Sequence, residues 1–231
     1  MSKAGIDQDA LIDMFSKASA QQTAQLRQAV GDATLKALQG REMSLKNIRN
    51  VIKTVTEAAS TGAAQNMMPA VDVGTMLDTA VAGVDDALLK AVEANRLALE
   101  RFVEQGATLQ DKTLKKALTD LDHFEDTLFT AMKKVAASAP AQITGPWAEV
   151  LGRFEQAGSL SGAKASATAE TMMAQMQDAM RQGRAASLKA AELMTQSYAT
   201  LVSGVLIGMS DALRQGGSAA AAKPAGKTPR K

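Results

Sequence analysis

Few side chains in this chain of 231 residues could carry out acid–base or nucleophilic chemistry. His123 is the only histidine, and it lies among the acidic residues Asp122, Glu125 and Asp126. Its neighbours on an expected helix face solvent, so we expect a surface histidine rather than a catalytic base. The serines fall in expected helices or linkers without a base nearby in sequence. The sequence therefore predicts a protein that is not an enzyme, with no catalytic residue.

Metal and cofactor sites are not indicated either. The chain has no cysteine, which removes thiolate nucleophiles, zinc–cysteine sites and iron–sulfur clusters together. None of the 17 glycines forms a dinucleotide-binding or phosphate-binding loop, and neither the HExxH motif nor a calcium-loop spacing occurs. We expect no metal and no cofactor.

The composition is that of helices with a shallow core. Hydrophobic residues make up 46% of the chain but aromatic residues only 3%. Because burial stabilises by about 25 cal/mol per Å² of apolar surface, alanine contributes less than leucine would. Residues 1–13 lack the apolar segment of a signal peptide, and the apolar run 198–209 is shorter than the roughly 20 residues that span a bilayer. We expect a cytoplasmic chain with no transmembrane segment.

Apolar residues at helical spacing predict an all-α fold, an elongated antiparallel bundle of about five long amphipathic helices. The first is expected over 7–39, where an eleven-residue repeat keeps the apolar stripe almost straight, and the second over 44–60. A third stretch is expected to open at Thr75, which forms a variant of the capping box with Asp78. It runs either through Gly106 or in two pieces on its two sides. No segment has the alternation of a strand.

The C-terminal half continues the helical pattern. Apolar spacing resumes over 114–135, a new helix is expected at Gly145-Pro146, and a last long helix over 165–214. This last helix carries a methionine cluster, which is either core or an adaptable binding surface; its members are Met172, Met173, Met176 and Met180. We expect a helical bundle domain over 1–215 and a disordered Ala/Lys/Pro/Gly basic tail over 216–231.

The third stretch carries the clearest apolar stripe. Its members are Leu77, Val81, Val84, Leu88, Val92, Leu99 and Phe102. Such a stripe normally packs against sister helices. Alanine-rich stripes with polar faces of mixed charge also occur on helices that lie flat on an apolar surface. The stripe is therefore a candidate either for surface binding or for helix packing.

Two further features lie near the C-terminal end. Gly204 and Gly208 have the GxxxG spacing that lets helix backbones approach closely, a candidate contact for a homo-oligomer. The tail carries four cations and no acid: Lys223, Lys227, Arg230 and Lys231. Removing these four from the net charge of +2 leaves the rest of the chain at −2. The tail either contacts DNA weakly and without sequence preference, through phosphates, or only solubilises the chain.

Residues 84–105 read VDDALLKAVEANRLALERFVEQ, and the tail contains AAAAKPAGK. Together with the alanine-rich helices, these segments resemble the phasins, proteins that coat bacterial polyhydroxyalkanoate granules. The tail is similar to those of histone H1-like bacterial proteins, and the chain also resembles uncharacterised alanine-rich helical bacterial proteins, for which no activity is implied. The phasin resemblance implies a non-enzymatic coat on a hydrophobic inclusion. The alternative is a structural or scaffold protein that oligomerises through partner helices, with no granule role.

Overall fold

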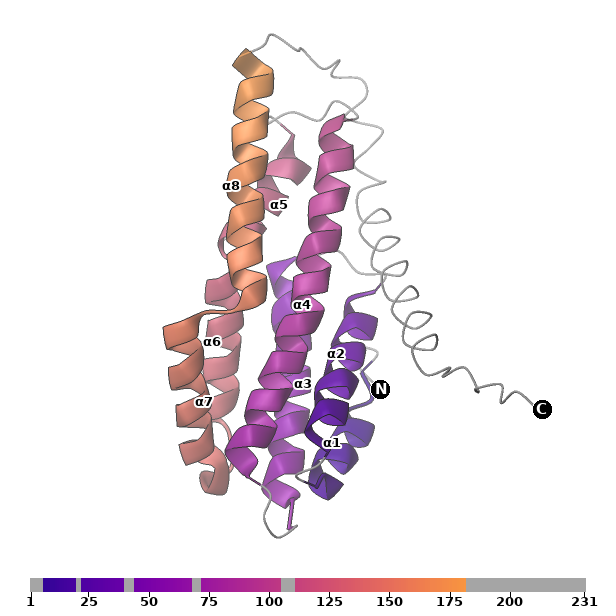
Figure 1. Cartoon of the computed structure of the whole chain (residues 1–231), viewed down its shortest axis with the longest axis vertical. Coiled ribbons are helices and arrows are strands. Elements are labelled where there is room, and N and C mark those ends of the chain that lie inside the picture. Colours follow the sequence, from indigo (N-terminus) through magenta and orange to yellow (C-terminus); the bar gives the residue numbers. More distant parts are fainter. Residues whose placement is uncertain (1–5, 20–21, 40–43, 68–71, 105–110, 182–231) are drawn as a thin grey trace, which may run out of the picture.

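Helix follows helix in the computed structural model, which describes residues 6–19, 22–39, 44–67, 72–104 and 111–181. The helices are α1 (Gln8–Lys17), α2 (Thr23–Leu38), α3 (Leu45–Gln65), α4 (Val73–Glu104), α5 (Lys112–Asp122), α6 (Phe124–Ala137), the short 3-10 helix η2 (Ala141–Ile143), α7 (Thr144–Ala157) and α8 (Leu160–Arg181). No strand occurs within these ranges, and the expected all-α elongated bundle is confirmed (Figure 1). The described part holds eight α-helices rather than about five, because several expected long helices are broken.

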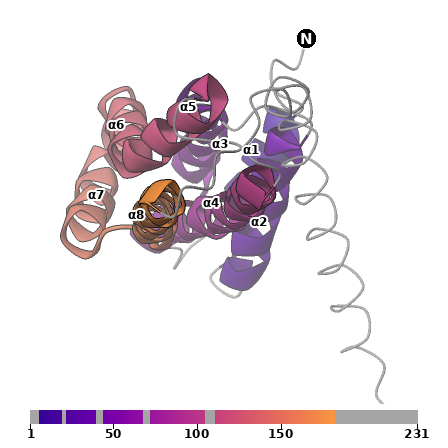
Figure 2. The same cartoon turned by 90° about the horizontal axis from the view of Figure 1, so that it is seen from above.

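The central element is α4, which contacts α2, α3, α7 and α8. It has 32 residues, which corresponds to a length of about 48 Å. More than half of these residues are buried. Seen from above, α4 lies between α2 and α8 (Figure 2). Because α4 has neighbouring helices on several sides, its apolar stripe is enclosed.

Two pairs of helices are stacked end to end. α5 is followed by α6 after a break at His123, and α7 is followed by α8 after a break at Gly158 and Ser159 (Figure 1). Gly158 has φ of 70°, in the left-handed region that favours glycine. The two breaks are in contact, because Glu125 in the first turn of α6 accepts a hydrogen bond from the backbone of Ser159, at 2.8 Å.

The direction of α8 departs from the antiparallel arrangement expected for neighbouring helices. Asp85 of α4 contacts Ser161 of α8, and Glu93 further along α4 contacts Lys164. From the first contact to the second, the residue number rises in both helices, so α4 and α8 run parallel. The reason lies in the end-to-end stacking, since α8 continues in the direction that α7 already takes beside α4 (Figure 1).

The helix expected over 7–39 is broken between α1 and α2. The amide Nδ2 of Asn66, just after α3, donates to the backbone oxygens of Phe15 and Ala18, at 2.8 and 3.0 Å. These hydrogen bonds satisfy carbonyl groups that a continuing helix would use itself. Ala18 takes an extended conformation in consequence. The expectation of one continuous helix was wrong.

The start of α4 also differs from the expected capping box. The carboxylate of Asp72 accepts hydrogen bonds from the backbone of Gly74 and Thr75, at 3.0 and 3.2 Å, and from the Thr75 hydroxyl. The hydrogen bond from Thr75 is the main cause that lowers the pKa of Asp72. Asp78 pairs instead with Arg153 of α7. Asp72 therefore caps the helix, and the Thr75–Asp78 prediction was wrong.

The stretch that was expected to pass or split at Gly106 contains three described helices. α4 ends at Glu104, and α5 begins after Asp111, whose carboxylate accepts from the backbone of Thr113 at 2.8 Å. Residues 105–110, with Gly106, lie outside the described residues. The apolar face expected over 114–135 is buried in α5 and α6, as predicted.

The remaining boundaries are close to those expected. Ser44 caps α3, which runs to Gln65 rather than to Ser60. The helix expected at Gly145-Pro146 is α7, and the last helix begins at Leu160 rather than at residue 165. In the described part of the chain, none of the helices is both long and apolar enough to cross a membrane.

Two glycines inside helices mark close contacts between helices. A Cβ atom added to Gly83 of α4 would lie 2.5 Å from the backbone oxygen of Arg27 in α2. One added to Gly62 of α3 would lie 2.5 Å from the Cβ atom of Phe15 in α1. No side chain fits at such distances, so these glycines fix how closely the helices pack.

Candidate functional site

The predicted apolar stripe lies entirely inside the bundle. All seven of its residues on α4 are buried, and the most exposed, Val81, retains 7% of its surface. The stripe therefore packs against sister helices in this structure. Contact between the stripe and an apolar surface would require one of the covering helices to move away.

The helix with the smallest side chains on its inward face is α8, one of the helices that contact α4. Its buried residues with described side chains are Ser161, Gly162, Ala165, Thr168, Ala169, Met172 and Met176. The inward face of α3, by comparison, has large β-branched residues, including Ile48, Val51, Ile52 and Val55. The free energy gained on burial grows with the apolar area removed from water. The hydrophobic contact that holds α8 to the bundle is therefore smaller than that of α3.

Charged residues line the contact between α4 and α8. The carboxylate of Glu93 accepts from Arg96 at 2.5 Å and pairs with Lys164 of α8 at 3.1 Å. The hydrogen bond from Arg96 is the main cause that lowers the pKa of Glu93; Lys164 acts in the same direction, and partial burial opposes both. Arg96 also pairs with Glu100, and these carboxylates raise its pKa.

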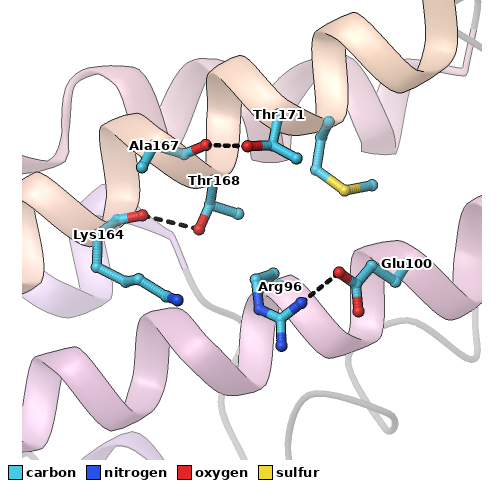
Figure 3. A pocket seen from close by; sticks show the side chains of 7 residues that line it. Arg96, Glu100, Lys164, Ala167, Thr168 and Thr171 are labelled. Carbon is cyan, nitrogen blue, oxygen red and sulfur yellow. Dashed lines mark hydrogen bonds and ion pairs between the residues drawn. The ribbon is translucent and has the colours of Figure 1, made fainter.

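A shallow pocket of about 240 Å³ lies beside these ion pairs, between α4 and α8 (Figure 3). Its lining residues are Arg96, Glu100, Lys164, Ala167, Thr168, Thr171 and Met172. The hydroxyls of Thr168 and Thr171 donate to backbone oxygens of their own helix, at 2.7 Å each. Arg96 and Lys164 are paired with carboxylates, so the charges in the pocket are balanced. The pocket is therefore a seam between two helices and has no surplus charge for a ligand.

The start of α8 is bound by two carboxylates from other helices. Asp85 of α4 accepts from the backbone of Leu160 at 2.9 Å, and from the backbone and hydroxyl of Ser161, at 3.1 and 2.5 Å. Glu125 of α6 accepts from the backbone of Ser159 at 2.8 Å. Asp85 is buried, with 8% of its surface exposed. A buried carboxylate needs compensating hydrogen bonds, and here the first turn of α8 supplies them.

Sequence reasoning missed Asp85 and Glu125 as interhelical contacts. Asp85 lies four residues after Val81 and three before Leu88, and so on the buried side of α4. An acid at such a position is a signal, because buried charges are rarely left without a partner. The partner is 76 positions away in the chain, where no local pattern could identify it.

The other predicted residues are scattered or lie outside the described part. His123 is exposed at the break between α5 and α6. In the methionine cluster, Met172 and Met176 are buried while Met173 is 42% exposed. The structure does not describe Gly204, Gly208, the side chain of Met180 or the four cations of the tail. Among the residues it does describe, no group of three or more acidic or histidine side chains is placed to hold a metal ion.

These observations define the class of protein: it is an all-α bundle in which the long helix α4 is covered by α2, α3, α7 and α8. The chain belongs to the family described as "Family of unknown function (DUF6781)", whose family model matches residues 1–215. The match stops just before the basic tail. No curated protein matches the chain, and no solved structure does.

Proposed function

We propose that this protein is a non-enzymatic, phasin-like coat of a hydrophobic intracellular inclusion, of the polyhydroxyalkanoate type. The stripe of α4 binds the apolar surface when α8 moves away. The observation that supports this proposal is the continuous stripe from Leu77 to Phe102 on α4, a helix that α8 contacts through mainly small inward residues.

Such an exchange costs little free energy. When the stripe moves from the interior of the bundle to an apolar surface, its leucine and valine side chains remain out of water. The inward face of α8 consists mainly of serine, glycine, alanine and threonine up to Ala169, so its exposure costs little hydrophobic free energy. The ion pairs of the seam are partly exposed, and pairs of this kind contribute only about 0–1 kcal/mol each.

A second role, a scaffold that associates through its helices, is favoured by a different observation. The stripe is already enclosed in the closed bundle, so this form presents no continuous apolar stripe on α4. A protein that acts in its closed form would bind partners through other faces. The two roles therefore differ in whether the bundle opens.

Microscopy of a fluorescent fusion in polymer-accumulating cells tests the proposal. We expect fluorescence in rings around the granules. A matched variant without residues 216–231 should give the same rings, because the proposed contact is made by helices rather than by the tail. Diffuse fluorescence of the full chain in cells that contain granules would contradict the granule role and favour the scaffold role.

A further inference from the structure

We infer that Asp85 and Glu125 form a latch that holds α8 closed over α4, and that opening of this latch is the step that exposes the α4 stripe. The inference rests on the proposed function for what the stripe then binds. The latch itself rests only on the contacts that Asp85 and Glu125 make with the start of α8, and separate experiments test the latch and the surface binding.

The latch satisfies three of the four backbone N–H groups that a helix leaves free at its start. Glu125 accepts from Ser159, and Asp85 accepts from Leu160 and Ser161. The remaining group, the N–H of Gly162, donates to the hydroxyl of Ser159 at 2.8 Å. Two negative charges at the N-terminus of α8 are also favoured by its helix dipole. The start of α8 thus depends on groups from α4 and α6.

Glycine at position 162 lets the Glu125 carboxylate approach the helix. A Cβ atom added there would lie 2.7 Å from the Cδ atom of Glu125 and 2.6 Å from the hydroxyl oxygen of Ser159. Just before the latch, Gly158 supplies the left-handed turn between α7 and α8. The N-terminal end of α8 therefore combines a close polar contact with a glycine turn that separates α8 from α7.

The rest of α8 contacts α4, α5 and α6, and apart from Met172 and Met176 it does so mainly through small side chains. Its inward side chains are small as far as Ala169, and its ion pair with α4 joins Lys164 to Glu93 at a partly exposed position. Loss of the latch should therefore release α8 as a unit, while the helices around α3 stay packed. Local opening of this kind is expected where few apolar contacts hold a segment.

The absence of cysteine lets a single introduced thiol report the opening. Ala165 of α8 and Ala59 of α3 are both fully buried. A thiol in Ala165→Cys should react with a maleimide only when α8 opens, and one in Ala59→Cys only when the α3 region opens. Asp85→Asn should raise the reaction rate at position 165 about tenfold, because one of the two accepting oxygens is replaced and a buried donor of the α8 start loses its acceptor, and leave the rate at position 59 unchanged.

Asparagine keeps the shape of aspartate but presents an NH₂ group to a helix start that offers only donors. Equal acceleration at positions 165 and 59 would mean general destabilisation and would overturn the latch, and so would no acceleration at either. If Asp85→Asn fails to give a helical protein, Glu125→Gln repeats the test on the other carboxylate. The same selective acceleration at position 165 is then expected.

A cross-link tests whether release of α8 is needed for surface binding. Glu93→Cys with Lys164→Cys, joined by a short bismaleimide, ties α8 to α4. Arg27→Cys with Asp86→Cys, at an ion pair of 2.6 Å, ties α2 to α4 as the matched control. Flotation with polyhydroxybutyrate particles should fall at least tenfold for the first cross-link and stay unchanged for the second.

The outcomes distinguish the two proposals. If unmodified protein does not float with the particles while Asp85→Asn still accelerates labelling at position 165, the latch stands and the granule role fails. If the protein floats equally well with α8 tied down, α8 release is not the exposing step, and the inference is overturned.

Discussion

Asp85 of α4 accepts hydrogen bonds from both the backbone and the hydroxyl of Ser161, 76 positions later in the chain. This contact joins the central helix to the first turn of α8, next to the break after α7. It places a buried carboxylate at the N-terminus of the helix that carries the smallest inward side chains. The stability of the seam between α4 and α8 should therefore be governed by polar contacts, whereas the region around α3 depends on apolar packing and close helix approach.

Gly83→Ala should destabilise the protein by about 1–3 kcal/mol, the usual cost of overpacking. The added methyl group would press against the backbone of α2, which cannot rotate away. Gly152→Ala in α7 is the matched control, because nothing lies within 4 Å of its added Cβ atom. That change should instead stabilise by roughly 0.5–1 kcal/mol through helix propensity. Urea denaturation followed by circular dichroism measures both, and equal effects of the two changes would contradict the close contact.

Ser60→Ala should cost about 1–3 kcal/mol of unfolding free energy. The Nε1 atom of Trp147 donates to the Ser60 hydroxyl at 3.0 Å in the core, and the variant leaves this donor without a partner. Trp147 is the only tryptophan, so its fluorescence follows unfolding directly. Ser138→Ala, at an exposed position, is the control and should change stability by less than about 0.5 kcal/mol. A loss at position 60 no larger than at position 138 would show that the hydrogen bond is not needed.

Acid should weaken the seam through Glu93. Its pKa is lowered in the folded protein, so its contribution to stability is present above the ordinary glutamate value of about 4.3. This contribution is lost as the pH falls from that value through the lower folded pKa. Glu93→Gln should therefore be less stable than the parent by about 0.5–1 kcal/mol at neutral pH. The difference should shrink below about pH 4.3. Urea titrations at a series of pH values measure it, and a difference that stays constant would contradict the ion-pair account.

If the basic tail contacts DNA, we expect it to do so only through phosphates, since its lysine and arginine residues neutralise charge without reading bases. With four cations, the slope of log K against log salt should be no steeper than about −3.6. Deleting residues 216–231 should abolish retardation of DNA at low salt and leave the helical content of the rest unchanged. Retardation that survives the deletion would place DNA binding on the helices instead.

The buried stripe of α4 could be predicted from the sequence because burial follows helical phase. Leu77 and Phe102 lie at opposite ends of this helix, and one apolar periodicity links them. The same reasoning predicted the buried face of α5 and α6 across the break at His123. Whether the stripe meets helices or a surface could not be read from periodicity, since both partners select the same pattern.

The breaks and caps could not be predicted, because distant side chains determine them. Asn66 ends α1 from about 50 positions away, and Asp85 and Glu125 hold α8 in the same long-range manner. At the start of α4, Asp72 and Thr75 compete as capping residues on local grounds, and the structure selects Asp72. Gly83 is a visible signal of close approach within a helix, but the sequence does not name α2 as its partner.

The distance between α4 and α8 on a polymer surface tests the central claim most directly. Spin labels on Glu93→Cys and Lys164→Cys, whose native side chains are 3.1 Å apart, report this distance in the full-length protein. In solution we expect a single short distance. On polyhydroxybutyrate particles the account predicts a shift to longer distances in the bound fraction. Bound protein that keeps the short distance would contradict the claim that α8 leaves α4 to expose the stripe.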